Sequence, residues 1–162
     1  AHAPLARLHP DLGELVRRQS EVAAKRGRTV TVDVLNEVTT RGHAERVERI
    51  IGHLVQNALD ATDPAGRVWI KLDRLGGEAL VEVGDTGQGM SPEFLRDRLF
   101  KPFQTTKQAG MGIGAYESFQ YVQELGGKIE VESELNVGTI VTLLLPLIET
   151  SKESDLHRLE DE

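Results

Sequence analysis

Polar residues and glycines interrupt apolar segments at four places in this sequence, and each place carries residue types that can bind a ligand. His53, Asn57 and Asp60 are four and three residues apart, so on a helix they form one polar stripe beside an apolar face. The amide oxygen of Asn57 can ligate Mg²⁺, which prefers oxygen ligands and usually keeps water and phosphates in its shell. The spacing alone leaves open the alternative of a structural asparagine.

A second interruption is Asp85, which continues the strand alternation of Val81 and Val83 and therefore points its carboxylate into an apolar layer. A buried carboxylate needs hydrogen-bond donors, and the exocyclic amino group of adenine is one candidate. The alternative is a turn aspartate that accepts from its own backbone in Asp85-Thr86-Gly87. The continuation Gly87-Gln88-Gly89-Met90 favours the ligand, because alternate glycines let the backbone approach a flat molecule.

Alternate glycines also open a later helix, in the run Gly110-Met111-Gly112-Ile113-Gly114. Backbone N–H groups at the positive end of a helix bind anions such as phosphates, although this run has neither the Rossmann nor the Walker spacing. The loop before it contains Thr106 and Lys107, which either reach phosphate oxygens or stay solvated. Gly138-Thr139, the fourth place, indicates only a turn by itself.

The elements that position these groups follow from the spacing of apolar residues, which alternates between helical and strand periods. Helices are predicted at residues 8–26, 44–61, 92–99 and 112–125. Strands are predicted at residues 29–34, 68–75, 79–83, 128–133 and 139–145, and a polar loop at 104–110. The pattern predicts an α/β (α+β) two-layer sandwich with a mixed, mostly antiparallel sheet and helices on one face.

Composition narrows the class of protein. The 162 residues suffice for one core, and no apolar run approaches the roughly 20 residues of a membrane span. The absence of cysteine excludes disulfides, thiolate metal sites and cysteine nucleophiles. A formal net charge of −7 argues against nucleic acid as a partner. Because the chain begins at Ala1 without an initiator methionine or a leader, we expect it to be a piece of a longer protein.

Taken in order, the four groups resemble the GHKL superfamily of gyrase, Hsp90, histidine kinase and MutL types. Residues 53–61 resemble its N box, 85–90 its G1 box, 99–103 the F box of histidine kinases, and 110–114 its G2 box. The resemblance covers about residues 47–146, ending with Gly138-Thr139 and Leu145-Pro146. It implies the Bergerat fold, in which ATP lies between the sheet and the helices under a lid.

The resemblance also implies a role for each matched residue. Asn57 would hold the Mg²⁺ that bridges the phosphates, Asp85 would accept from the adenine amino group, and Thr139 would support Asp85 and an ordered water. Gly87 and Gly89 would give the base room, while Lys107 would contact a phosphate from the lid. Gly110, Gly112 and Gly114 would hinge the lid and donate N–H groups to phosphates. The other residues placed around the nucleotide are Asp60, Ala61, Met90, Thr106, Met111 and Ile113.

Position 53 bears on whether the phosphoryl group passes to water or to a protein. Hydrolytic members usually carry a glutamate there as general base, and many kinases carry asparagine, so His53 departs from both. A weak base, a triphosphate contact and a packing role stay open for His53. Asp60 also departs, since many kinases have lysine there. The F box and the Thr-Thr-Lys run at 105–107 favour the kinase, and the run at 112–117 is similar to kinases linked to exosortase or PEP-CTERM systems.

The resemblance therefore implies the ATP-binding catalytic domain of a two-component sensor histidine kinase, with in-line transfer of the ATP γ-phosphoryl group to a histidine. The alternatives are a GHKL-type ATPase domain of the clamp or chaperone kind and a nucleotide sensor without catalysis. In such kinases an acidic residue follows the acceptor histidine and a proline comes a few positions later. None of the five histidines of this chain has that context.

The acceptor is therefore expected on a dimerisation domain of the same kinase, with a response regulator as the downstream partner. Residues 1–28 would form a connecting helix from that domain, 29–147 the ATP-binding catalytic domain, and 148–162 a disordered acidic tail. We expect this chain to be monomeric, to bind ATP without labelling itself, and to lie in the cytoplasm, either free or as part of a membrane-anchored kinase.

Overall fold

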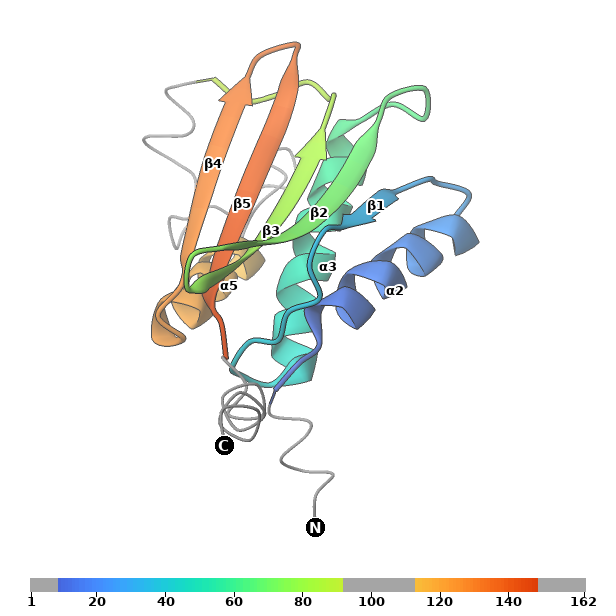
Figure 1. Ribbon diagram of the computed structural model, residues 1–162. Coiled ribbons are helices and arrows are strands. Elements are labelled where there is room, and N and C mark those ends of the chain that lie inside the picture. The colour runs from blue at the N-terminus through green and yellow to red at the C-terminus, as the bar shows by residue number, and fades with distance from the viewer. Residues whose placement is uncertain (1–8, 92–112, 149–162) are drawn as a thin grey trace, which may run out of the picture.

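The computed structural model describes residues 9–91 and 113–148 (Figure 1). Its helices are α2 (Leu12–Lys25), α3 (Ala44–Ala61) and α5 (Ile113–Glu124). Its strands are β1 (Thr31–Val34), β2 (Val68–Leu75), β3 (Glu78–Asp85), β4 (Lys128–Glu134) and β5 (Gly138–Pro146). The helix predicted at 92–99, the loop at 104–110, the F box and nearly all of the predicted tail lie outside the described residues.

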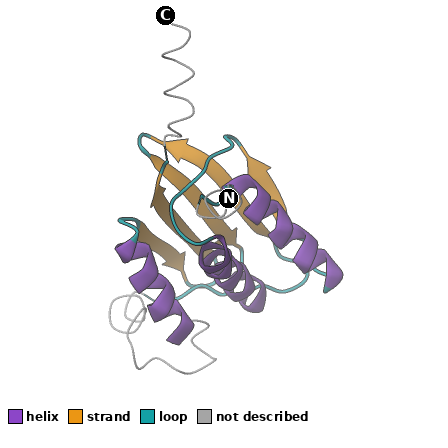
Figure 2. Ribbon diagram, turned by 90° about the horizontal axis from the view of Figure 1, so that it is seen from below, coloured by secondary structure: helices purple, strands orange, loops and turns teal. Residues whose placement is uncertain are grey.

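The strands form one sheet in the order β1-β2-β3-β5-β4, in which β1 runs parallel to β2 and the other neighbours are antiparallel. Helices α2, α3 and α5 lie on one face of this sheet (Figure 2). The predicted fold class, a mixed and mostly antiparallel sheet with helices on one face, is confirmed.

The core lies between the sheet and the helices, because the spacing of apolar residues gives each of these elements one apolar face. Helix α3 has the predicted bounds because its apolar residues recur on one side, and those residues are all buried: Val47, Ile50, Ile51, Leu54, Val55, Ala58 and Leu59. Opposite them, the register pairs Ile70 with Val83 and Leu72 with Val81, so the alternating apolar residues of β2 and β3 face the same layer.

Helix α2 belongs to the same folded unit as the sheet. Leu12, Leu15, Val16 and Ala23 are buried in the same core. The helix begins at Asp11, whose Oδ1 accepts a hydrogen bond from the N–H of Gly13 at 3.0 Å, as expected of an N-cap aspartate. The role of α2 as a connection from a dimerisation domain stays a prediction.

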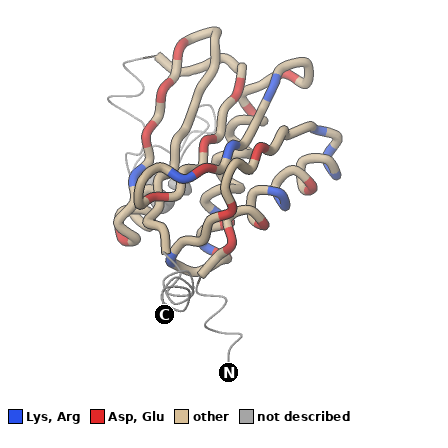
Figure 3. The backbone as a smooth tube through the Cα atoms, in the orientation of Figure 1, with Lys and Arg blue, Asp and Glu red and all other residues tan. Residues whose placement is uncertain are grey.

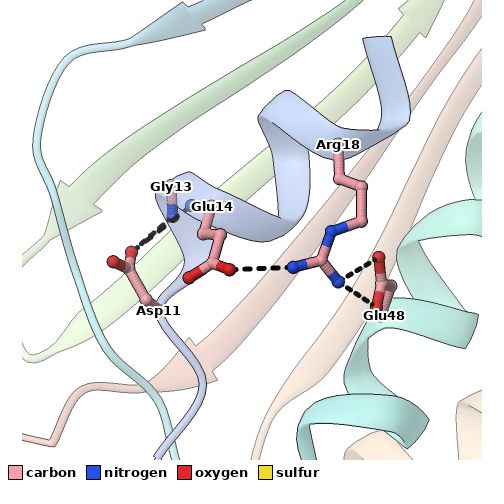
Figure 4. A network of polar contacts seen from close by, with 5 residues as sticks. All are labelled: Asp11, Gly13, Glu14, Arg18 and Glu48. Carbon is pink, nitrogen blue, oxygen red and sulfur yellow. Dashed lines mark hydrogen bonds and ion pairs between the residues drawn. The ribbon is translucent and has the colours of Figure 1, made fainter. Parts of the chain in front are cut away.

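One ion pair links α2 to α3, and it shares its arginine with a second pair within α2. The guanidinium of Arg18 lies 2.8 Å from a carboxylate oxygen of Glu14 and 2.8 Å from one of Glu48 on α3 (Figure 4). Pairs this exposed contribute about 0–1 kcal/mol each, so the buried apolar face of α2 matters more to its attachment.

Helix α5 is fastened to the start of α3 by Tyr121. The buried Tyr121 hydroxyl accepts from the N–H of His43 at 3.0 Å, and the guanidinium of Arg46 lies 3.7 Å from the centre of its ring. The segment that follows residues 92–112 is therefore anchored to the helix that carries Asn57.

The sheet face away from the helices is polar along β4. Lys128, Glu130, Glu132 and Glu134 are exposed at alternate positions, and Figure 3 shows acidic residues recurring on that strand. In the described part of the chain, no helix is long and apolar enough to cross a membrane.

Candidate functional site

The last turns of α3 carry the first group of predicted site residues. His53, Asn57 and Ala61 follow one another at intervals of four residues, so they lie one turn apart along one side of the helix. His53 and Asn57 are half-buried, whereas Asp60 is exposed. Asp60 accepts a hydrogen bond from Gln56 Nε2 at 2.8 Å, and Gln56 Oε1 accepts from Arg26 at 2.8 Å, which links the ends of α2 and α3.

The amide of Asn57 has capacity for a ligand. Its Nδ2 atom is buried and has no hydrogen-bond partner among the described residues. Leaving such a group unpaired costs about 1–3 kcal/mol. Because the two ends of an amide can exchange by rotation, the same position can present the oxygen that Mg²⁺ requires.

No group of three or more His, Cys, Asp or Glu residues in the described part of the chain could hold a metal ion by itself. Asn57 can supply one oxygen to Mg²⁺ where water and nucleotide phosphates supply the remaining ligands. Its role as the metal ligand stays a prediction.

Asp85 is the second predicted anchor, and the structure buries it at the end of β3 with 6% of its surface exposed. It lies between Val68 of β2 and Thr139 of β5 in the register of the sheet. Its Oδ1 accepts from the N–H of Gly87 at 2.8 Å. The turn expected as the alternative is thus present, but a carboxylate has about four acceptor positions and this turn uses one of them.

Burial raises the pKa of the Asp85 carboxyl above its ordinary value of 3.8. The N–H groups of Gly87 and Thr139 and the hydroxyl of Thr62 oppose this rise in pKa. The Thr62 Oγ1 atom is buried, and among the described residues it has no hydrogen-bond partner at ordinary distance and angle. Asp85 and Thr62 therefore place a carboxylate acceptor and a hydroxyl that no described residue pairs with at the same end of the domain.

The glycines of the segment after Asp85 have a role within the chain. A Cβ atom on Gly87 would lie 2.2 Å from the carbonyl oxygen of Ala61, and one on Gly89, with φ +70°, would lie 2.0 Å from that of Glu134. The sequence predicted these glycines as room for a base. The structure shows that they let this segment approach the backbones of α3 and β4.

Backbone hydrogen bonds complete this junction. The N–H of Gln88 donates to the carbonyl of Ala61 at 3.2 Å, and the carbonyl of Gln88 accepts from the N–H of Asn136 at 2.7 Å. The segment carrying Asp85 is therefore fixed to the end of α3, one turn from Asn57. The two predicted anchors lie at the same end of the molecule.

A cavity of about 570 Å³ opens at this end. It brings together Asp60, Ala61 and Gly87 of the predicted site. The residues that also line it, which the sequence did not single out, are Thr62, Asp63, Ala65, Gly66, Thr86, Gln88 and Asn136.

Thr139 and Met90 meet at a residue that the sequence analysis missed. Thr139 is 8% exposed, and its Oγ1 lies 2.7 Å from the Oγ of Ser133, which also accepts from the N–H of Met90 at 2.7 Å. Ser133 follows Ile129 and Val131 at alternate positions on β4. It was therefore detectable as a polar residue in an apolar alternation, the signal that identified Asp85.

The predicted phosphate end of the site is only partly described. Thr106, Lys107, Gly110, Met111 and Gly112 lie outside the described residues, and Ile113 and Gly114 form the first turn of α5. The contacts expected of these residues with phosphates stay predictions.

Comparison with known proteins gives one family. Residues 42–149 match the family described as histidine kinase-, DNA gyrase B-, and HSP90-like ATPases. Sensor protein DegM of Bacillus sp. (strain B21-2) is 31% identical over 134 residues, which are 83% of this chain and 36% of that protein. Sporulation kinase D of Bacillus subtilis (strain 168) is 36% identical over 103 residues, which are 64% of this chain and 20% of that protein.

Solved structures agree. The catalytic domain of histidine kinase ThkA is 29% identical with a TM-score of 0.72, over 85% of this chain and 95% of that one. The mycobacterial sensor histidine kinase MprB, at 24% identity and a TM-score of 0.72 over 86% and 96% of the chains, shows a likeness of fold. This chain thus spans about a third or less of these two curated relatives. Neither is named for exosortase or PEP-CTERM systems.

Proposed function

Because the chain belongs to the family of histidine kinase-, DNA gyrase B-, and HSP90-like ATPases, we propose that it is the ATP-binding catalytic domain of a sensor histidine kinase. Membership of an ATPase family implies ATP binding. The observation that carries the finer proposal is the junction of Gln88 and Gly87 with Ala61. This junction attaches the segment that follows Asp85 to a residue one helical turn from Asn57. Names of relatives such as sensor protein DegM and sporulation kinase D support a kinase.

In this proposal Asp85 recognises the adenine base. Its carboxylate accepts from the exocyclic amino group of adenine, and the N–H of Gly87 holds that carboxylate in place. Guanine presents a carbonyl oxygen at the equivalent position. Two acceptors would then face each other, so the site should discriminate against GTP.

Asn57 serves the other end of the nucleotide. Its buried amide would ligate Mg²⁺, which when bound offsets the charge of the phosphates. The residues of this chain then position the γ-phosphoryl group for transfer. The bond from the γ-phosphorus to the bridging oxygen breaks, a bond to an imidazole nitrogen forms, and ADP leaves.

The test is calorimetric titration of the wild type, Asp85→Ala and Asn57→Ala with ATP, with and without Mg²⁺. We expect Asp85→Ala to lose measurable binding of every adenine nucleotide. Asn57→Ala should lose mainly the gain in affinity that Mg²⁺ gives. Unchanged affinity in a folded Asp85→Ala protein would contradict the proposal.

The acceptor in this proposal is a histidine of a dimerisation domain, and a response regulator acts downstream in the cytoplasm. With ATP labelled in the γ-phosphoryl group, we expect no labelled histidine in this chain alone. Label should appear on the dimerisation domain of the same kinase when that domain is supplied.

Hydrolysis is the second candidate, favoured by the position of His53 one turn before Asn57. An imidazole there could take a proton from water. Appreciable ATP turnover by this chain, lost in His53→Ala with nucleotide affinity preserved, would favour an ATPase over a kinase.

A further inference from the structure

Ser133 joins three groups at the end of the sheet where Asp85 lies. It is half-buried on β4, on the face covered by helices. Its Oγ lies 2.7 Å from the N of Met90, 2.7 Å from Oγ1 of Thr139, and 3.2 Å from the carbonyl oxygen of Gly138. A single hydroxyl therefore meets the segment after β3 and the first residues of β5.

Counting donors and acceptors fixes the direction of these hydrogen bonds. A hydroxyl donates one hydrogen bond and accepts two. The Met90 N–H can only donate and the Gly138 carbonyl can only accept. The arrangement that satisfies all three contacts has Ser133 donating to Gly138 while it accepts from Met90 and from the Thr139 hydroxyl. All of its hydrogen-bonding capacity is then used.

These three partners surround the segment that holds Asp85. Thr139 is opposite Asp85 in the pairing of β3 with β5. Gly138, with φ +146°, packs so closely that a Cβ atom would lie 2.0 Å from the carbonyl oxygen of Asp85. Met90 lies five residues beyond Asp85, after the turn at Gly87. Ser133 thus connects Met90, at the end of this segment, to β5, the strand that pairs with Asp85 at its beginning.

We propose that Ser133 is a positioning residue for the adenine-binding carboxylate. Its hydroxyl holds Met90 and Thr139 in one arrangement, and so fixes the path of residues 85–90 between β5 and α3. The role depends on the proposed function, since what Ser133 positions is the residue that would read the base. Ser133 itself need not touch the nucleotide.

Three substitutions separate this role from general stability. Ser133→Ala removes the hydroxyl, and Ser133→Thr retains it on a side chain suited to a strand. Ser20→Ala is the matched control. The Ser20 hydroxyl on α2 also donates to a backbone carbonyl, that of Val30, at 3.1 Å, just before β1. We expect Ser133→Ala to weaken Mg-ATP binding about tenfold, equivalent to about 1.4 kcal/mol. Ser133→Thr and Ser20→Ala should stay within about twofold of the wild type, less than about 0.5 kcal/mol.

The affinities are measured by titration at a temperature where all the proteins are folded. Equal losses in Ser133→Ala and Ser20→Ala would reduce Ser133 to an ordinary stabilising residue and overturn the proposal. If Ser133→Thr bound Mg-ATP as weakly as Ser133→Ala, the proposal would also be overturned, because the hydroxyl would then not explain the loss of affinity.

A second measurement needs no nucleotide. Hydrogen exchange of the Met90 amide, followed by NMR in the ligand-free protein, should quicken in Ser133→Ala and stay slow in Ser133→Thr. Unchanged protection of Met90 in Ser133→Ala would overturn the proposal. If the wild type bound no adenine nucleotide, the proposed function would fail, while the exchange of Met90 would still decide whether Ser133 holds this segment.

Discussion

Among single residues, Asp85 is a carboxylate in a buried position. The buried charge lowers the free energy of unfolding, whereas the proposed recognition of adenine requires it. Burial raises the pKa of its carboxyl above 3.8, so the folded protein holds this proton more tightly than the unfolded chain. The free energy of unfolding therefore falls as the pH rises from the ordinary pKa through the raised one. Above that window the cost of the buried charge is fully present.

Asp85→Asn should remove this cost while keeping the shape of the turn, because an amide oxygen can still accept from the N–H of Gly87. We expect the ligand-free variant to be more stable than the wild type at neutral pH, by about 0.5–2 kcal/mol. The difference should disappear as the pH approaches the ordinary value of 3.8. Urea denaturation across this range measures it.

The control for this prediction is Asp33→Asn, which changes an exposed aspartate on β1. Its free energy of unfolding should change by less than about 0.5 kcal/mol. Binding of ATP to Asp85→Asn should weaken even though the fold gains stability. A variant that is less stable at neutral pH would show that the charge of Asp85 supports the fold.

At the scale of elements, the junction of α3 with the segment after β3 depends on close backbone contact. Gly87→Ala would place a methyl group 2.2 Å from the Ala61 carbonyl, and neither backbone can yield without moving the other. We expect a loss of about 1–3 kcal/mol in the free energy of unfolding together with weaker nucleotide binding. Thermal denaturation and titration with ATP test both effects.

Gly77→Ala is the matched substitution for this test, since a Cβ atom there would meet nothing within 4 Å. It lies in the turn between β2 and β3, at the opposite end of those strands from Gly87. Its stability and nucleotide affinity should remain near those of the wild type. Similar losses in both variants would show that the junction with α3 is not the cause.

A separate prediction at this scale concerns helix α2, because its apolar face is part of the core. Leu12 is 0% exposed, so Leu12→Ala should lower the free energy of unfolding by about 2–5 kcal/mol. Leu35→Ala, at a leucine that is 52% exposed, should change it by less than about 0.5 kcal/mol. Equal effects in chemical denaturation would mean that α2 is only loosely attached.

For the whole molecule, the sequence predicted the elements whose evidence is local. The apolar period defined α3 to the residue, and alternation placed Asp85 on the covered face of the sheet. The bounds of β3 were predicted too short, as 79–83, because Gly84 has no side chain to show a face. The structure places the Trp69 ring against Gly84 and continues the pairing to Asp85.

What the sequence could not supply are contacts between distant segments. The need for glycine at position 87 comes from Ala61, and that at position 89 from Glu134, neither of which is a sequence neighbour. Ser133 interrupts the apolar alternation of β4, but its importance depends on its contacts with Met90 and Thr139, which come from other segments. The predicted site residues were chosen by residue type, whereas the contacts that support them could be found only from the fold.

If the two ends of the site act together, binding should stabilise the whole domain. A ligand at 100 times its dissociation constant adds about 2.7 kcal/mol to the free energy of unfolding. For a domain of this size each kcal/mol raises Tm by about 2–4 °C, so Mg-ATP should raise Tm by roughly 5–10 °C. Mg-GTP should raise it far less, since guanine offers Asp85 an acceptor, and Asp85→Ala should show no shift with either nucleotide. Thermal scans at matched concentrations decide this, and equal shifts with ATP and GTP would place recognition in the phosphates rather than at Asp85.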